Sequence, residues 1–234
     1  MSTDPIADLR ARLARQHGPA ALRPATDLSA YAPLLPSGTP ARDALAGVFP
    51  RGQITELCGV PGSGVGTLVT AALASAGRAG RLVAIVDREA TFDAATAAAH
   101  GVDLDALLIV RPKSSSAAIT AITQLCGERD LALVVLDDYP VLARAPGGPA
   151  ALQAAIPRWL CALRTSGGVL LVTTPHDAAP GGALDDAAAL RLGVQRLRWD
   201  ISDPLHPVLY SQIIVRRRGG GAAGGTVEIA LRYG

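Results

Sequence analysis

A glycine-rich segment in the first third of the chain has the spacing of a phosphate-binding loop. In such a loop, backbone amides and a helix N-terminus cradle the phosphates, a lysine reaches the β- and γ-oxygens, and a serine or threonine hydroxyl holds magnesium. Here Val65 stands at the lysine position and Gly66 at the hydroxyl position. The positions that would face a nucleotide are Gly59, Gly62, Ser63, Gly64, Val65, Gly66 and Thr67. The turn-forming glycines are therefore present, but the two side chains that would bind the phosphate oxygens and the magnesium ion are absent.

Without the lysine, the chain should bind a terminal phosphate more weakly. Losing one charge-assisted hydrogen bond costs about 1.5–3 kcal/mol, roughly ten- to a hundredfold in affinity. Thr67 is one helical step, about 100°, past the hydroxyl position, and the sole lysine, Lys113, follows a different predicted strand. We therefore expect a protein that is not an enzyme and binds no cofactor, with the loop kept as architecture. Two alternatives stay open: weak binding of ATP and magnesium without turnover, and slow hydrolysis that uses an arginine from elsewhere.

Two carboxylates follow predicted strands at positions where an ATPase would use them. The apolar run 133–136 leads into Asp137, where an aspartate would fix magnesium through water. A neighbouring apolar run ends near Glu89, where a carboxylate would orient an attacking water. Acidic residues also end many strands of such sheets for other reasons, so we treat both residues as vestigial parts of a hydrolytic site.

Short apolar runs alternate with helical patterns between residues 53 and 172. Strands that are apolar on both faces and separated by helices predict a parallel sheet covered on both sides. The segment 189–233 is instead rich in β-forming residues with Pro- or Gly-bearing turns, which predicts antiparallel strands at one edge. The expected fold class is α/β, a P-loop core with a mostly parallel central sheet, antiparallel C-terminal edge strands and an N-terminal helical arm.

A proline-rich connection divides the chain. Ile6, Leu9 and Leu13 have helical spacing, and prolines recur from residue 24 to residue 50. We therefore expect an arm and connection over residues 1–36 and a core over residues 37–234. Leu9 and Leu13 either fold back on their own core or dock on a neighbouring subunit or related protein.

The composition excludes several classes of protein. With 22 Lys and Arg against 20 Asp and Glu, the net charge of +2 does not indicate a polyanion binder, and 49% hydrophobic residues exclude a disordered chain. No apolar run is long enough to span a bilayer, and no secretory signal is present, so we expect a cytoplasmic protein. The three cysteines and four histidines lack metal-ligand spacing, so we expect buried free thiols and no metal site.

The order of these pieces resembles the RecA family over nearly the whole chain. The similar segments, beside the loop and the two carboxylates, are residues 15–18, 37–45, 51–59, 92–93, 101–105, 215–218 and 228–234. This resemblance implies a RecA-like core in which Glu89 falls on the catalytic glutamate and Asp137 on the Walker B aspartate. It also implies that the C-terminal domain of RecA is absent.

Departures from the family pattern indicate a different role. Thr173 and Thr174 replace the Asn-Gln switch of the family, and the two DNA-binding loops look reduced to residues 143–149 and 175–182 with a single arginine. A strand-exchange groove needs more cations than this. Truncated relatives of this type include the ImuA group, which implies an accessory factor of SOS-type translesion mutagenesis, working with an ImuB-like protein and an error-prone polymerase. A slow RecA-like ATPase in DNA repair, and a regulator that binds a RecA recombinase filament, remain alternatives.

The densest basic region lies on two neighbouring predicted strands. It comprises Arg196, Arg198, Arg216, Arg217 and Arg218. Alternation along a strand places Arg196 and Arg198 on one face, and Arg216 and Arg218 on one face. This stripe is either a contact for a partner or for weakly or indirectly bound DNA, or a sheet edge kept in solution by its charge.

Overall fold

The computed structural model of the chain describes residues 34–35, 39, 49–137, 139–175, 183–218 and 224–232. The predicted arm helix with Leu9 and Leu13 lies outside these residues, so the arm stays a prediction. Within the described ranges, no helix combines the length and apolar character needed to cross a membrane.

Strands and helices alternate along the core, as the apolar rhythm predicts. The strands are β1 (Leu34–Leu35), β2 (Phe49–Pro50), β3 (Gln53–Gly59), β4 (Leu82–Val86), β5 (Leu107–Val110), β6 (Leu131–Leu136), β7 (Val169–Thr174), β8 (Ala188–Asp200), β9 (Val208–Arg218) and β10 (Thr226–Arg232). The helices are α4 (Val65–Arg78), α5 (Ala94–Ala99), α6 (Ser115–Gly127), α7 (Tyr139–Arg144), α8 (Gly148–Ser166) and α9 (Ala183–Ala187).

The central sheet has eight strands in the order β10-β9-β8-β3-β7-β6-β4-β5. Neighbouring strands from β8 to β5 pair in parallel, whereas β9 pairs antiparallel with both β8 and β10. The predicted α/β class with a mostly parallel sheet and antiparallel C-terminal edge strands is therefore confirmed. Strands β1 and β2 form a separate antiparallel pair.

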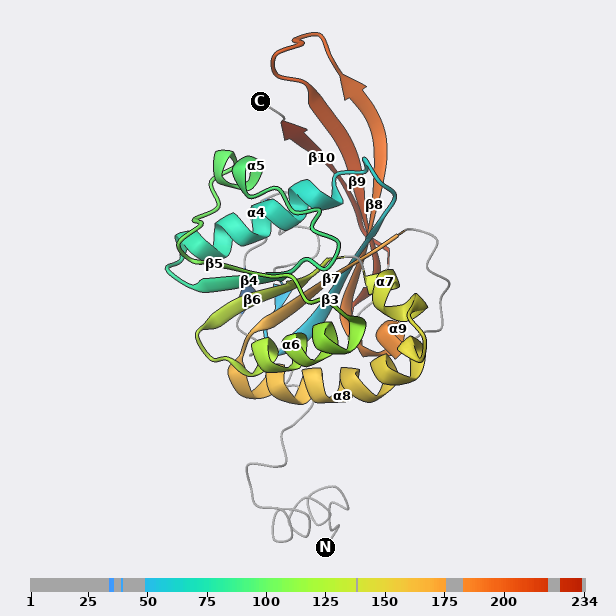
Figure 1. Cartoon of the computed structure of the whole chain (residues 1–234). Coiled ribbons are helices and arrows are strands. Elements are labelled where there is room, and N and C mark those ends of the chain that lie inside the picture. The colour runs from blue at the N-terminus through green and yellow to red at the C-terminus, as the bar shows by residue number, and fades with distance from the viewer. Residues whose placement is uncertain are drawn as a thin grey trace, which may run out of the picture. The chain divides into compact units, whose positions relative to one another are not determined.

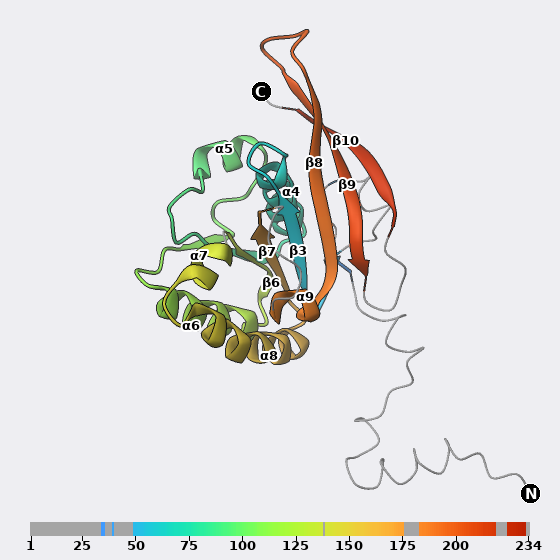
Figure 2. The same ribbon diagram turned by 90° about the vertical axis from the view of Figure 1, so that its right-hand side faces the viewer.

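Helices cover both faces of the parallel part of the sheet (Figures 1 and 2). Side chains of α4 pack in one core, and side chains of α6 and α8 pack in the other. Strand β4 serves both, because Val83 and Ile85 face the first core while Ala84 and Val86 face the second. Burial on both faces explains why the parallel strands are apolar at successive positions.

Helix α8 carries the largest buried side chain of the second core. Trp159 is fully buried, and its indole N–H donates to Thr123 Oγ1 of α6 at 2.9 Å. Trp159 therefore packs in the second core and is anchored to α6 by its indole nitrogen. Pro157 lies inside α8 without ending it.

Two further predictions are corrected by the structure. The expected loop at residues 143–149 is largely helical, because α7 continues to Arg144 and α8 begins at Gly148. Cys58 and Cys126 are buried free thiols as expected, but Cys161 is exposed. It lies two residues after Trp159, about 200° around the helix, and so faces away from the core.

We expect Trp159→Ala to lower the free energy of unfolding by about 3–5 kcal/mol, because it opens a cavity between α6 and α8. Urea denaturation followed by far-ultraviolet circular dichroism measures this loss. Trp159→Phe is the matched control: it keeps a ring but loses the indole hydrogen bond, so its cost should be about 1–3 kcal/mol. Equal stability of Trp159→Ala and the unaltered protein would contradict the assigned packing.

Candidate functional site

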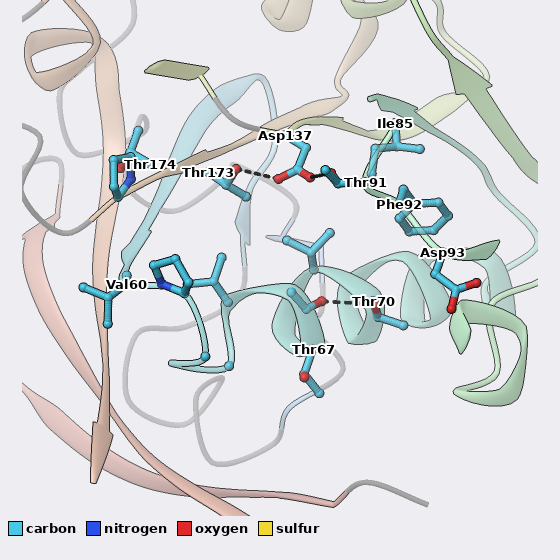
Figure 3. A pocket seen from close by; sticks show the side chains of 18 of the residues that line it. Val60, Thr67, Thr70, Ile85, Thr91, Phe92, Asp93, Asp137, Thr173 and Thr174 are labelled. Carbon is cyan, nitrogen blue, oxygen red and sulfur yellow. Dashed lines mark hydrogen bonds between the residues drawn. The ribbon is translucent and has the colours of Figure 1, made fainter. Parts of the chain in front are cut away.

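A cavity of about 660 Å³ lies where the loop between β3 and α4 meets the carboxyl ends of the parallel strands. Its wall combines the glycine-rich loop, the first turns of α4, the segment after β4, Asp137 and the end of β7 (Figure 3). The fold therefore brings together residues that are distant in sequence. All predicted loop positions line this cavity except Ser63, which is buried.

The loop begins with a β-turn that satisfies its own backbone. Pro61 and Gly62 occupy the centre of the turn, Gly62 has φ 76°, and Ser63 N–H donates to the carbonyl of Val60 at 3.0 Å. A Pro-Gly pair suits this turn because the residue after proline takes positive φ. The Ser63 amide is therefore used inside the loop.

Two glycines of the loop lie where no side chain fits. A Cβ atom at Gly59 would be 2.7 Å from Val65 Cγ2 and 2.9 Å from the carbonyl oxygen of Val194. Gly64 has φ 98°, and a Cβ there would collide with Leu231 Cδ1 of β10. Packing against β8 and β10 thus requires these glycines whether or not a ligand is bound.

The side chains that would grip a triphosphate are replaced by apolar or absent groups. Val65 is half-buried and packs against the core below α4. Nothing lies within 4 Å of a Cβ placed at Gly66, so this position leaves open space. Thr67 lines the cavity, but its side chain points away from Asp137 (Figure 3). Lys113 is exposed and does not line the cavity.

Asp137 is held by hydroxyl groups on both of its carboxylate oxygens. Thr173 Oγ1 of β7 donates to Oδ1 at 2.8 Å, and Thr91 Oγ1 donates to Oδ2 at 3.3 Å (Figure 3). The predicted vestigial aspartate therefore lies in the cavity. The threonine pair at residues 173–174, which the sequence marked only as a departure, supplies one of the donors.

Glu89 lies apart from this cavity. Its side chain is exposed and pairs with Arg88 at 2.7 Å, and it is not among the lining residues. The structure thus brings Asp137 to the loop but leaves the second predicted carboxylate at the surface.

A buried aspartate that the sequence analysis did not single out shapes the segment after β4. Asp87 accepts hydrogen bonds from the amides of Thr91 at 2.8 Å and Phe92 at 3.3 Å, and it pairs with Arg111 at 3.0 Å. These bonds turn the chain so that Thr91 reaches Asp137 and Phe92 enters the cavity. Its position at a strand end is visible in the sequence, but its partners are not.

A second buried cluster lies on the opposite side of β7. Thr174 donates to Glu56 at 2.6 Å, and Arg191 pairs with Glu56 at 2.9 Å and also with Asp185. Burial, together with the charges of Glu56 and Asp185, raises the pKa of Tyr139 to about 12. Consecutive threonines of β7 therefore bind different carboxylates on the two sides of the strand.

The predicted arginine stripe is split by a β-bulge. Arg196 lies opposite Ser211 and Arg198 opposite Tyr210, with a register shift between them. Neighbouring residues of β9 face opposite sides, so the two arginines do too, and the expected common face is wrong. Arg198 stacks over the Tyr210 ring at 3.6 Å.

Of the remaining members of the stripe, the structure describes the side chain of Arg216 alone. Arg216 is half-buried, and the side chains of Arg217 and Arg218 lie outside the described part of the structure. A cation that does line the cavity is Arg144, at the end of α7.

Comparisons with known proteins assign the sequence to a family. Residues 20–147 match the RecA N-terminal domain family. The protein RecA of Tropheryma whipplei (strain Twist) is 37% identical over 135 residues, which cover 56% of this chain and 31% of that protein. The protein RecA of Paenarthrobacter aurescens (strain TC1) is 35% identical over 135 residues, 56% of this chain and 39% of that protein. The matched part thus spans less than half of these relatives.

A solved structure shares the fold. The crystal structure of the RadB recombinase superposes with a TM-score of 0.64 and 21% sequence identity, covering 83% of this chain and 94% of that one. At this identity the likeness concerns the fold.

A matched pair of substitutions tests whether packing requires a glycine at position 59 of the loop. Gly59→Ala should cost about 1–3 kcal/mol of unfolding free energy, because its Cβ meets backbone and buried atoms. Gly66→Ala, in open space in the first turn of α4, should instead leave stability unchanged or raise it by up to about 1 kcal/mol. Chemical denaturation of both variants measures the difference, and equal midpoints would contradict this account.

Proposed function

The chain belongs to the RecA family, and from this premise we propose that it is a non-hydrolysing accessory protein in DNA damage tolerance. In this proposal it acts in SOS-type translesion mutagenesis through contacts with a mutagenic polymerase complex. The observation that carries the proposal is the cavity of about 660 Å³, which retains the shape of a phosphate loop without the groups that hold a triphosphate.

The residues present do not fit a magnesium-bound triphosphate. Val65 supplies no ammonium and Gly66 supplies no hydroxyl, so the two side-chain groups that hold the phosphates and the magnesium are absent. Hydrolysis also needs a group that orients water, and Glu89 is turned to the surface beside Arg88. Protein contacts are therefore the better-supported mode of action for this chain.

One observation favours a second candidate. Arg144 lines the cavity, so a guanidinium is available near the loop. Charge-assisted bonds from arginine to phosphate are strong. Weak nucleotide binding, with slow hydrolysis as its extreme form, is therefore the alternative that a titration must address.

We expect calorimetric titration with ATP and magnesium to give no saturable binding below about 1 mM. The double variant Val65→Lys with Gly66→Thr should bind roughly ten- to a hundredfold more tightly, because it restores the ammonium and the hydroxyl. The pair Val65→Leu with Gly66→Ala is the control, since it alters size without adding either group. If the unaltered chain binds ATP saturably at micromolar concentration and turnover is lost in Glu89→Gln, the proposal is wrong and the ATPase alternative takes its place.

A second measurement tests the partner. The tagged chain, recovered from cells of its own host after DNA damage, should bring down an ImuB-like protein and an error-prone polymerase. Recovery of a RecA recombinase alone would favour a filament regulator instead.

A further inference from the structure

Exposed apolar side chains gather on the hairpin between β8 and β9. Four of the eight large hydrophobic residues that are exposed in the described part of the chain lie within residues 197–205. They are Leu197 at 45%, Trp199 at 43%, Ile201 at 70% and Leu205 at 79% exposure. Clustered exposure of this kind marks interaction sites, whereas single exposed apolar residues need no explanation.

The hairpin is exposed because β8 extends past the end of its parallel neighbour β3. Strand β3 ends at Gly59 opposite Val194, but β8 continues to Asp200. From residue 195 to residue 199 every side chain of β8 is exposed, on both faces. Figures 1 and 2 show this ribbon projecting past the end of β3.

One arginine lies between this hairpin and the glycine-rich loop. Arg196 Nη1 is 3.5 Å from the position of a Cβ at Gly62, so its guanidinium lies against the loop. Arg196 and Trp199 pair with Ser211 and Leu209, the two β9 residues that approach Gly64, and therefore share the loop face of the ribbon. Among the described residues, no carboxylate lies within ion-pair distance of Arg196.

The exposed tip of the loop adds apolar surface next to this cation. Val60 is 44% exposed and Pro61 is exposed. We name the ensemble of Val60, Pro61, Arg196 and Trp199 the hairpin–loop surface. Tryptophan and arginine are the residue types that most often dominate binding energy at protein interfaces.

The acidic groups of the hairpin turn are occupied locally. Asp200 accepts from the amide and hydroxyl of Ser202 at 3.0 and 2.6 Å, and Asp203 contacts His206 at 2.9 Å. Hydrogen bonds from these neighbours hold the pKa of both carboxyls below their usual range, so they stay ionised. Among the described residues of this surface, the positive charge without an ion-pair partner is therefore the guanidinium of Arg196, which lies against the loop at Gly62.

A nucleic acid is a poor match for this arrangement. Its affinity rests on several cations along a phosphate backbone. Here Arg196 is a single cation, because Arg198 is already near Glu228 at 3.7 Å and stacked on Tyr210. Complementary charge instead calls for one carboxylate flanked by apolar groups.

We propose that the hairpin–loop surface docks a linear segment of another protein that presents a carboxylate to Arg196 and a large apolar side chain to Trp199. This inference rests on the proposed function, since it supplies the protein contact through which an accessory factor acts. It also assigns the loop tip to a protein interface.

Selection from a displayed library of random short peptides on the full chain tests this proposal. Enriched peptides should combine Asp or Glu with Leu, Phe or Trp, and their affinity should fall roughly tenfold or more in Arg196→Glu and in Trp199→Ser. Lys113→Glu is the matched control, because it makes the same charge change at an exposed site beyond β5 and should leave affinity unchanged. Circular dichroism of each variant confirms that it is folded.

Several outcomes would overturn the proposal. They are the absence of enrichment over the Arg196→Glu/Trp199→Ser double variant, enrichment of basic peptides, or equal loss of affinity in Lys113→Glu. Binding of short single-stranded or duplex DNA that depends on Arg196 would assign the surface to nucleic acid instead. If the double variant still recovers polymerase subunits from cells, the surface assignment fails while the proposed function stands.

Discussion

The constraint on which the site depends is the connection from β3 to α4 across the end of a sheet that is buried on both faces. The chain must turn within residues 60–64 while it packs against β8 and β10, and neither Gly59 nor Gly64 has room for a Cβ atom. This packing demand explains why the loop has glycine at positions 59 and 64 although Val65 and Gly66 stand where an active phosphate loop has a lysine and a hydroxyl. The glycines serve the fold, whereas the lysine and hydroxyl of an active loop serve only the ligand.

Strand β7 carries the second organising feature. Its last two residues, Thr173 and Thr174, point to opposite sides and bind Asp137 and Glu56. One hydroxyl donates a hydrogen bond to Asp137 in the cavity, and the other helps to satisfy the buried carboxylate of Glu56, which also pairs with Arg191. Buried charges are tolerated only with such partners, so this strand end keeps polar groups in an otherwise apolar sheet.

The sequence predicts the features of this molecule that follow from a periodic pattern or from residues close together in the chain. Apolar strands between helical patterns predict the doubly covered sheet, and a strand end predicts the place of Asp137. What it does not reveal are contacts made across the fold: Asp87 turning the chain toward Asp137, or the bulge that separates Arg196 from Arg198. Glu89 shows the same limit, because family position alone does not determine which way an exposed side chain points. Such features depend on register and tertiary packing, which one-dimensional spacing does not encode.

The two tryptophans of the chain occupy opposite environments. Trp159 is enclosed and hydrogen-bonded between α6 and α8, while Trp199 projects from the β8–β9 ribbon. The first indole therefore emits from an apolar interior, and the second from a partly solvent-exposed position. The wavelength of tryptophan emission can therefore distinguish unfolding of the interior from binding at the β8–β9 ribbon, without any added label.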